Sequence, residues 1–184
     1  MTQPISITFS HVGLYVTDLD RMVDFYTRFL GFVVSDRGGS KGEAQLVFLT
    51  RDANEHHQIV LATGRPADLP FNVVNQISFR VDSLRTLRQL HAALENEPVT
   101  DIRPVSHGNA LSVYFRDPEG NRIELLIDTP WYVPQPLRFP VDLSLPDAQL
   151  WASIEERARA IPGFKPRAEW QAAIADKLAR AHAA

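Results

Sequence analysis

The stretch HVGLYVTDLDRMVDFYTRF, residues 11–29, is matched 65 positions later by QISFRVDSLRTLRQLHAAL, residues 76–94. In both copies apolar residues first fall at every second position, as in a strand with one buried face, and then change to helical spacing at Asp18 or Asp82. We expect these two aspartates to cap the helices. Self-similarity at a fixed offset indicates that one structural unit is present twice.

Three strand-like segments follow each predicted helix, which gives the order β-α-β-β-β in both copies. The segments are residues 32–36, 45–50 and 57–63 in the first copy, and 101–106, 112–116 and 122–128 in the second. A sheet that a helix covers on one face leaves the other face for a partner layer or a ligand. The sequence therefore predicts an α+β fold in which two paired βαβββ modules, about residues 5–65 and 71–130, form a cleft within a domain of residues 1–135.

Residues 136–184 are predicted to form a C-terminal helical extension. It is reached through the proline-rich stretch TPWYVPQPLRFP at residues 129–140, which we expect to be an extended strap without strands, because proline cannot donate a hydrogen bond to a sheet. Two helices with apolar stripes are predicted beyond it, separated by Pro162–Gly163. Such stripes dock either on the body of the protein or on a partner subunit.

The composition is that of a globular protein, since 45% of the 184 residues are hydrophobic and 22% are charged, with a formal net charge of −3. The basic residues are scattered, which disfavours a nucleic-acid partner. No apolar run or leader pattern indicates a membrane span or secretion, so we expect no membrane association and a cytoplasmic location. The lack of cysteine excludes disulfides, thiolate metal sites and a cysteine nucleophile. Dinucleotide, P-loop and serine-hydrolase motifs are absent too.

Strand alternation places His11, Gln76, Tyr114 and Glu124 on the face opposite the helices, which is the face that lines the predicted cleft. An imidazole and a carboxylate suit Fe(II), Mn(II) or Zn(II). The repeat puts Gln76 at the position of a third ligand, and it puts Val60 at the position equivalent to Glu124, so the fourth side has no protein donor. We therefore predict a metal site formed by His11, Gln76 and Glu124.

Each of these residues also has an interpretation without a function. Arg122 is a candidate counter-charge for Glu124, and His11 and Gln76 suit a solvated strand equally well. Tyr114 suits a packed aromatic position. His107 precedes Gly108 in a tight turn and needs no role beyond that turn.

Two adjacent histidines, His56 and His57, precede the last strand of the first module. Strict alternation from Val60 directs His56 toward the cleft. His57 takes that place only if a bulge near Gln58 breaks the alternation. The sequence leaves this choice open.

The sequence resembles the vicinal oxygen chelate superfamily, and within it the extradiol catechol dioxygenases, over about residues 5–135. The resemblance is carried by the motifs HVGLYVTDLDRMVDFYTRFLGF, HHQIVLA and SHGNALSVYFRDPEGNRIEL. It implies a metal-centred cleft between paired modules. The metal residues that it implies are His11 and Glu124, and the residues that it implies for handling protons and substrate are His57, Tyr114 and His107. Gln76 replaces the family's second metal histidine, but glyoxalase-type members use Gln as a ligand.

The resemblance implies a metal-dependent extradiol-type dioxygenase, with a small aromatic diol and O₂ as substrates. Fe(II) is the expected cofactor, and Mn(II) or another divalent metal is the alternative, because the hard amide oxygen of Gln76 lowers the affinity for Fe(II). Two other functions remain open, a metal-dependent lyase or isomerase of the glyoxalase type and a non-catalytic aromatic-binding module. The family's paired modules and the apolar tail helices lead us to expect a homo-oligomer.

Overall fold

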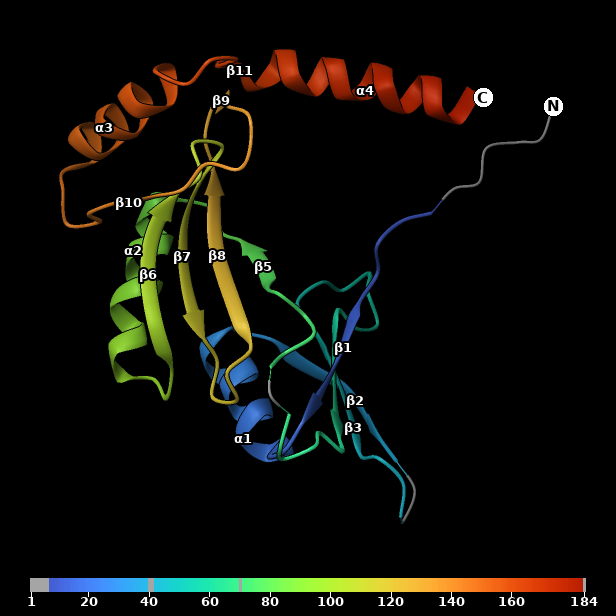
Figure 1. Cartoon of the computed structure of the whole chain (residues 1–184). Coiled ribbons are helices and arrows are strands. Elements are labelled where there is room, and N and C mark those ends of the chain that lie inside the picture. Colours follow the sequence, from blue (N-terminus) through green and yellow to red (C-terminus); the bar gives the residue numbers. More distant parts are fainter. Residues whose placement is uncertain (1–6, 40–41, 70, 184) are drawn as a thin grey trace. The chain divides into compact units, whose positions relative to one another are not determined.

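A computed structural model describes residues 7–39, 42–69 and 71–183 (Figure 1). This part of the chain divides into two compact units. The N-terminal unit comprises the residues up to 75 together with residues 117–121, and the C-terminal unit comprises residues 76–116 and those from 122 onward. The turn 117–121 therefore belongs to the N-terminal unit. The predicted boundaries also include residues 1–6 and 184, which lie outside the described residues.

The N-terminal unit has the predicted order β-α-β-β-β. Its elements are β1 (Val12–Val16), α1 (Leu19–Asp24), a π-helical turn that continues α1 (Phe25–Phe29), β2 (Val33–Gly38), β3 (Leu46–Thr50) and β4 (Ile59–Thr63). The strand order in the sheet is β1-β4-β3-β2, and β1 runs parallel to β4. Asp18 caps α1 as predicted, because its carboxylate accepts a hydrogen bond from the backbone N–H of Arg21 at 3.0 Å.

The C-terminal unit repeats this arrangement. Its first elements are β5 (Ile77–Arg80), α2 (Leu84–Ala93), a 3₁₀ turn (Leu94–Asn96), β6 (Thr100–Ser106), β7 (Ala110–Arg116) and β8 (Arg122–Asp128). The strands lie in the order β5-β8-β7-β6, which matches the first sheet. The prediction that Asp82 caps the helix is wrong. Ser83 is the cap, because its hydroxyl accepts from the backbone N–H of Thr86 at 3.1 Å and donates to the carboxylate of Asp82.

The register confirms the duplication residue by residue. Gly13 lies opposite Val60 in the parallel pair β1–β4, and Ser78 lies opposite Glu124 in the parallel pair β5–β8. Val60 therefore occupies the place of Glu124 in the first copy, as the sequence predicted.

Alternation along the strands separates the two faces of the second sheet. The residues of β7 and β8 that point to the buried face are Leu111, Val113, Phe115, Ile123, Leu125 and Ile127, all at most 7% exposed. Helix α2, with Leu84 and Leu87 buried, contacts both strands. Each such side chain contributes about 1.5–3 kcal/mol when it leaves water. The residues between them, among them Tyr114 and Glu124, point to the opposite face.

The proline-rich strap contains short strands, contrary to the prediction. They are β9 (Trp131–Tyr132) and β10 (Phe139–Pro140), followed by α3 (Asp147–Arg159), β11 (Lys165–Pro166) and α4 (Arg167–Ala183). β10 pairs with β6 at the edge of the sheet, and β11 pairs with β9. Proline is tolerated there because an edge strand leaves N–H positions that need no partner.

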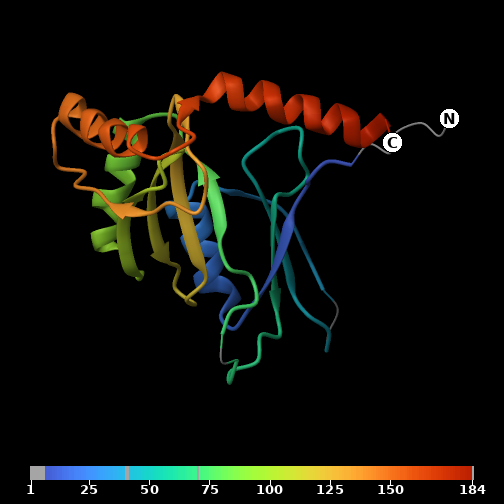
Figure 2. The same cartoon turned by 45° about the horizontal axis from the view of Figure 1, so that its top comes forward.

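The two tail helices differ in how they are covered. Helix α3 docks through Leu150, Ile154 and Ala158, all fully buried, whereas Leu178 of α4 is 52% exposed. Figure 2 shows α4 extending from β11 away from α3. No helix in residues 7–39, 42–69 or 71–183 is long and apolar enough to cross a membrane.

Candidate active site

Glu124 lies on the face of the second sheet that α2 leaves uncovered. It is 5% exposed, and its Oε2 accepts hydrogen bonds from the hydroxyl of Ser78 at 2.5 Å and from the side-chain amide of Gln76 at 2.9 Å. Both donors are neutral. Among the described residues Glu124 has no ion pair, and Arg122 does not supply the counter-charge that its sequence position suggested. A buried carboxylate in this state loses hydration without compensation from a positive charge.

This arrangement fits a divalent cation. A cation beside Glu124 supplies the missing counter-charge, and rotation of the Gln76 amide presents its oxygen as a second donor. His11, the other residue of the predicted set, belongs to the N-terminal unit. No cluster of three or more His, Cys, Asp or Glu side chains with metal-binding geometry occurs in the part of the chain that the structure describes. The three-ligand set therefore stays a prediction.

His107 and Tyr114 form a hydrogen-bonded pair on the same face. The Nδ1 of His107 lies 2.7 Å from the carbonyl oxygen of Leu137, and its Nε2 lies 3.0 Å from the hydroxyl of Tyr114. A carbonyl can only accept, so Nδ1 carries the proton. In the neutral ring Nε2 is then an acceptor, and the Tyr114 hydroxyl donates to it.

The turn that holds His107 requires a glycine at the next position. Gly108 has φ = +73°, and a Cβ at that residue would clash with the side chain of Val133. The backbone N–H of Gly108 donates to the hydroxyl of Ser106 at 3.0 Å. The sequence interpretation of a tight turn is confirmed, and the ring of His107 also bonds to Tyr114 and Leu137.

Tyr114 is held in its protonated form. Burial, followed by the negative charge of the neighbouring Glu124 carboxylate, raises the pKa of its phenol to about 12. Tyr114 and Glu124 are direct cross-strand partners in β7 and β8. The phenol therefore stays neutral at physiological pH and serves as a hydrogen-bond donor to His107.

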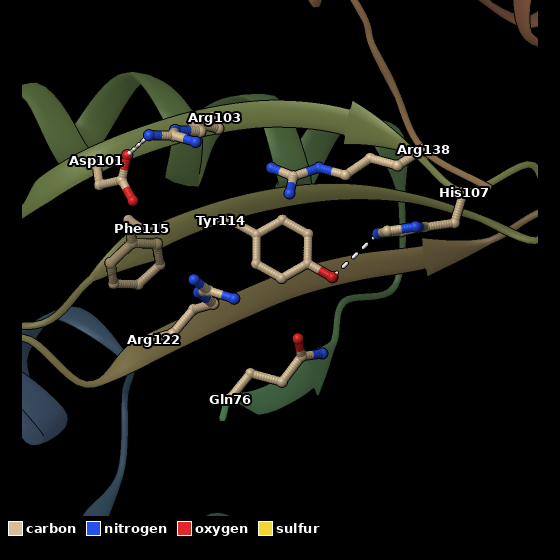
Figure 3. Close-up of a pocket in the computed structure, with 8 residues that line it drawn as sticks. All are labelled: Gln76, Asp101, Arg103, His107, Tyr114, Phe115, Arg122 and Arg138. Atoms are coloured by element: carbon tan, nitrogen blue, oxygen red, sulfur yellow. Dashed lines mark hydrogen bonds and ion pairs between the residues drawn. The ribbon is translucent and has the colours of Figure 1, made fainter. Parts of the chain in front are cut away.

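A pocket of about 140 Å³ opens on this face of the C-terminal unit (Figure 3). Its walls come from β6, β7, β8, the residue before β5 and the strap, and the lining residues are Gln76, Asp101, Arg103, His107, Tyr114, Phe115, Arg122 and Arg138. No pattern in the sequence predicts that Arg103 and Arg138 line this pocket. Arg103 follows a register shift between Thr100 and Arg103, and Arg138 comes from the strap. Ser78 and Arg122 lie on the same face as Gln76 and Glu124, two residues along their strands.

The N-terminal unit holds a second group of predicted residues. The rings of His11 and His57 are 4.2 Å apart, whereas His56 is exposed and its Nε2 lies 4.0 Å from the carboxylate of Asp36. His57 is therefore the histidine beside His11. Strand β4 begins only at Ile59, so the alternation that favoured His56 does not reach back to these residues.

The pKa of His57 is lowered from its ordinary value, first because the ring loses solvent and then because of the neighbouring His11 and His56. A lowered pKa leaves the imidazole neutral at pH 7. A neutral imidazole keeps one nitrogen that can accept a proton or bind a metal. Nδ1 of His57 lies 2.8 Å from Nδ1 of His56, so Nε2 is the nitrogen without a hydrogen-bond partner in the described part of the chain.

The DPEGN segment of the sequence motif has a structural role in the N-terminal unit. Glu119 accepts hydrogen bonds from the backbone N–H groups of Thr17, at 2.8 and 2.9 Å, and of Asp18, at 2.7 Å. Arg65 pairs with the same carboxylate at 3.4 Å. These bonds satisfy free N–H groups at the start of α1, where the helix dipole favours a negative charge.

Comparisons with known proteins agree with the fold. Biphenyl-2,3-diol 1,2-dioxygenase 2 of Rhodococcus globerulus is 31% identical over 124 residues, which are 65% of this chain and 62% of that protein. The chain thus spans less than two thirds of the length of this relative. The glyoxylase/bleomycin resistance protein/dioxygenase domain from Frankia sp. EAN1pec superposes with a TM-score of 0.57 at 25% identity, over 68% of this chain and 93% of that one. The trypanothione-dependent glyoxalase I of Leishmania major superposes with a TM-score of 0.55 at 25% identity, over 66% and 87%.

A family profile completes the comparison. The Glyoxalase/Bleomycin resistance protein/Dioxygenase superfamily matches residues 8–125, which include both βαβββ arrangements through most of β8. The predicted α+β class and the predicted family are both confirmed. Because the match covers more than half of the chain, the protein belongs to the Glyoxalase/Bleomycin resistance protein/Dioxygenase superfamily.

Proposed function

We propose that the protein is a metal-dependent dioxygenase that opens the ring of a catechol-like aromatic beside its diol. One observation carries the proposal. The buried Glu124 carboxylate, which has only neutral donors in the described part of the chain, lies directly across the sheet from the Tyr114–His107 pair. An anionic metal ligand beside a proton-transfer pair is what the deprotonation of a diol at a metal requires. The similarity to a biphenyl-diol dioxygenase supports the same reaction class.

Glu124 and Gln76 are the proposed metal ligands of the C-terminal unit, and the sequence repeat adds His11 as the third. When bound, Fe(II) or Mn(II) would lower the pKa of the diol hydroxyls and bring the diol and O₂ together. The amide of Gln76 is neutral, as is an unprotonated imidazole, so its presence does not change the net charge of the ligand set.

Tyr114 and His107 act as a proton relay in this proposal. A diol hydroxyl donates its proton to the phenol oxygen of Tyr114 while Tyr114 passes its own proton to Nε2 of His107. Tyr114 ends neutral, in agreement with its raised pKa, and His107 ends as an imidazolium whose Nδ1–H still donates to Leu137. His57 is proposed as a second acid or base, since its lowered pKa leaves it able to accept a proton at pH 7.

The test is oxygen uptake by the full chain after anaerobic purification and loading with Fe(II) or Mn(II). Catechol, 2,3-dihydroxybiphenyl and 3,4-dihydroxybenzoate serve as substrates, and a coloured ring-opened product formed with one O₂ per diol is expected. Glu124→Gln removes the anionic metal ligand at nearly the same side-chain size and should abolish oxygen uptake. Metal binding that is accompanied by no uptake with any diol contradicts the proposal. His11→Ala tests the third ligand, and metal affinity equal to that of the wild type removes it from the set.

Gln76 supports a second candidate, a lyase or isomerase of the glyoxalase type. Its amide lies 2.9 Å from Glu124, so an amide oxygen and a carboxylate are available together as hard donors. Such donors suit a metal that stabilises an enediolate without redox chemistry. The chain's similarity to a glyoxalase I structure at 25% identity is in line with this candidate. Isomerisation of a hemithioacetal by the metal-loaded protein, without oxygen uptake, would favour it.

A further inference from the structure

The residues that line the pocket of the C-terminal unit have a net positive charge. Arg103, Arg122 and Arg138 line it, against the single carboxylate of Asp101. Asp101 pairs with Arg103 at 2.5 Å and with Arg116 at 3.6 Å, so one negative charge is shared between two arginines. The chain as a whole has a net charge of −3, so this concentration of arginine does not follow from its composition.

Arg122 is the most exceptional of these residues. It lies directly opposite Arg116 across β7 and β8, and like charges in that position destabilise a sheet. Within the described residues its guanidinium has neither an ion pair nor a hydrogen bond. Figure 3 shows this guanidinium beyond the Tyr114 ring from His107, directed into the pocket. An uncompensated, half-buried charge aimed into a pocket favours a ligand of opposite charge.

Arg138 adds a second cation above the same ring. Its guanidinium carbon lies 5.6 Å from the centroid of the Tyr114 ring, and it has no ion pair in the described part of the chain. The pocket is therefore walled by an aromatic ring and two planar guanidinium groups. Its volume of about 140 Å³ is close to that of the roughly 150 Å³ cavity that holds benzene in an engineered protein core. One aromatic ring fits, and a second ring would have to lie outside.

Glu124 does not itself line this pocket, but its hydrogen-bond partner Gln76 does. Arg122 and Glu124 point to the same face two residues apart, which corresponds to about 7 Å along a strand. That is about the span of one benzene ring with its substituents. A ring whose diol reaches Glu124 and Tyr114 therefore presents its far substituent to Arg122.

We propose that the substrate is an aromatic diol with a carboxylate on its ring, and that Arg122, assisted by Arg138, binds this carboxylate. The inference rests on the proposed function and names the substrate class of that site. The planar guanidinium fork matches a carboxylate in a bidentate manner. Arg103 already forms an ion pair with Asp101, so it adds only to the positive electrostatic potential of the pocket.

The test is equilibrium binding under anaerobic conditions, by calorimetry, with the full chain both metal-free and loaded with Mn(II). The probes are 3,4-dihydroxybenzoate and catechol. We expect the carboxylated diol to bind about tenfold more tightly than catechol, with an advantage that shrinks as salt is raised. Arg122→Gln should lower the affinity for 3,4-dihydroxybenzoate about tenfold and should change the affinity for catechol by less than about threefold.

Controls separate a specific contact from a general effect. Arg80→Gln removes an arginine of the same sheet that pairs with Asp128 outside the pocket, and it should leave both affinities unchanged. Arg122→Lys keeps the charge and should restore part of the lost affinity. Arg138→Gln, on the exposed strap, provides a second variant in case Arg122→Gln does not fold.

Equal affinity for the two probes in the wild type, or equal weakening of both by Arg122→Gln, overturns the carboxylate site. Preferential binding of 3,4-dihydroxybenzoate without oxygen uptake supports the carboxylate site and refutes ring cleavage. Oxygen uptake with catechol but no preference for the carboxylate keeps the dioxygenase and refutes this inference.

Discussion

The hydroxyl of Tyr114 lies 3.0 Å from Nε2 of His107, whose other ring nitrogen is already bonded to a backbone carbonyl. This second bond fixes the direction of the first, because it makes Nε2 the acceptor in the neutral ring. The pair therefore has one direction for proton movement, from Tyr114 to His107. A phenol that is fixed in this way can accept a proton from a ligand as it gives up its own.

Tyr114→Phe should remove this relay and leave the fold intact. We expect kcat for oxygen uptake with a diol to fall about 10²-fold, the usual size of a lost acid–base contribution. Metal affinity should stay within about twofold, since the hydroxyl is not a proposed ligand. Tyr132→Phe is the control, because the Tyr132 ring stacks on Trp170 in the tail. An unchanged kcat in Tyr114→Phe would exclude the hydroxyl from proton transfer.

The titration of Tyr114 can be followed without any turnover. Its pKa of about 12, against 10.0 for a free phenol, arises first from burial and then from Glu124. The ultraviolet difference between wild type and Tyr114→Phe should therefore show no phenolate signal at pH 10. Glu124→Gln should move the titration to lower pH. Between about pH 10 and 12 the folded protein keeps a proton that the unfolded chain releases, so this residue makes unfolding easier as the pH rises through that window.

Glu124→Gln should have opposite effects on the metal-free and metal-loaded protein. Without metal, the neutral amide avoids the burial of a charge, and its oxygen still accepts from Ser78 and Gln76. We expect a free energy of unfolding equal to that of the wild type or up to about 2 kcal/mol higher. With Mn(II) at 100 times its Kd, the free energy of unfolding of the wild type should rise by about 2.7 kcal/mol, and that of the variant should not change.

The control for this experiment is Glu156→Gln, which changes an exposed carboxylate on α3. It should keep the full stabilisation by Mn(II). Stabilisation of Glu124→Gln by Mn(II) to the same extent as the wild type would show that Glu124 is not a ligand.

The lowered pKa of His57 can be assigned to its neighbours by NMR titration of the metal-free protein. We expect a pKa below 6.5 in the wild type, because the ring loses solvent and lies 4.2 Å from the ring of His11. His11→Ala removes the charge of that neighbour and should raise the pKa of His57. His91→Ala, on α2 of the other unit, should leave it unchanged. A His57 pKa that is insensitive to His11 would leave burial and His56 as its causes.

The fold could be predicted from the sequence because the decisive signals are local. Alternating apolar residues define the strands, and the repeat identifies Val60 and Glu124 as equivalent positions, which the strand register confirms. The same alternation brought Gln76, Tyr114 and Glu124 to one face. These inferences need only the two-residue period of a strand.

The rest of the site depends on irregular backbone, which has no period. A register shift precedes Arg103, and Asp101 within it has φ = +60°. Arg138 reaches the pocket only because β10 pairs with the edge strand β6, a long-range contact that a proline-rich stretch does not predict. The choice between His56 and His57 stays open in the sequence for the same reason, since both lie before the strand begins.

Asp117, in the turn 117–121, tests how burial competes with hydrogen bonding. Its Oδ1 accepts from the backbone N–H groups of Glu119 at 3.0 Å and Asn121 at 2.9 Å, and its Oδ2 accepts from the Asn121 amide at 2.8 Å and the Tyr26 hydroxyl at 3.3 Å. These bonds lower the pKa of the carboxyl, but burial is the larger effect and raises it above 3.8. In Asp117→Asn an NH₂ group replaces Oδ2, and this group cannot accept the hydrogen bond from the Asn121 amide. We therefore expect the free energy of unfolding to fall by about 1–3 kcal/mol at pH 7.

The pH dependence of that loss shows which effect is larger. With a raised pKa, the folded protein binds more protons than the unfolded chain between pH 3.8 and the folded-state pKa, so the stability contributed by Asp117 falls as the pH rises through that interval. Urea unfolding of wild type and Asp117→Asn at a series of pH values should therefore give a stability difference that widens toward acid pH. A difference that narrows toward acid pH would mean that the four hydrogen bonds outweigh burial, and that the folded protein holds Asp117 as a carboxylate below the pKa of the free side chain.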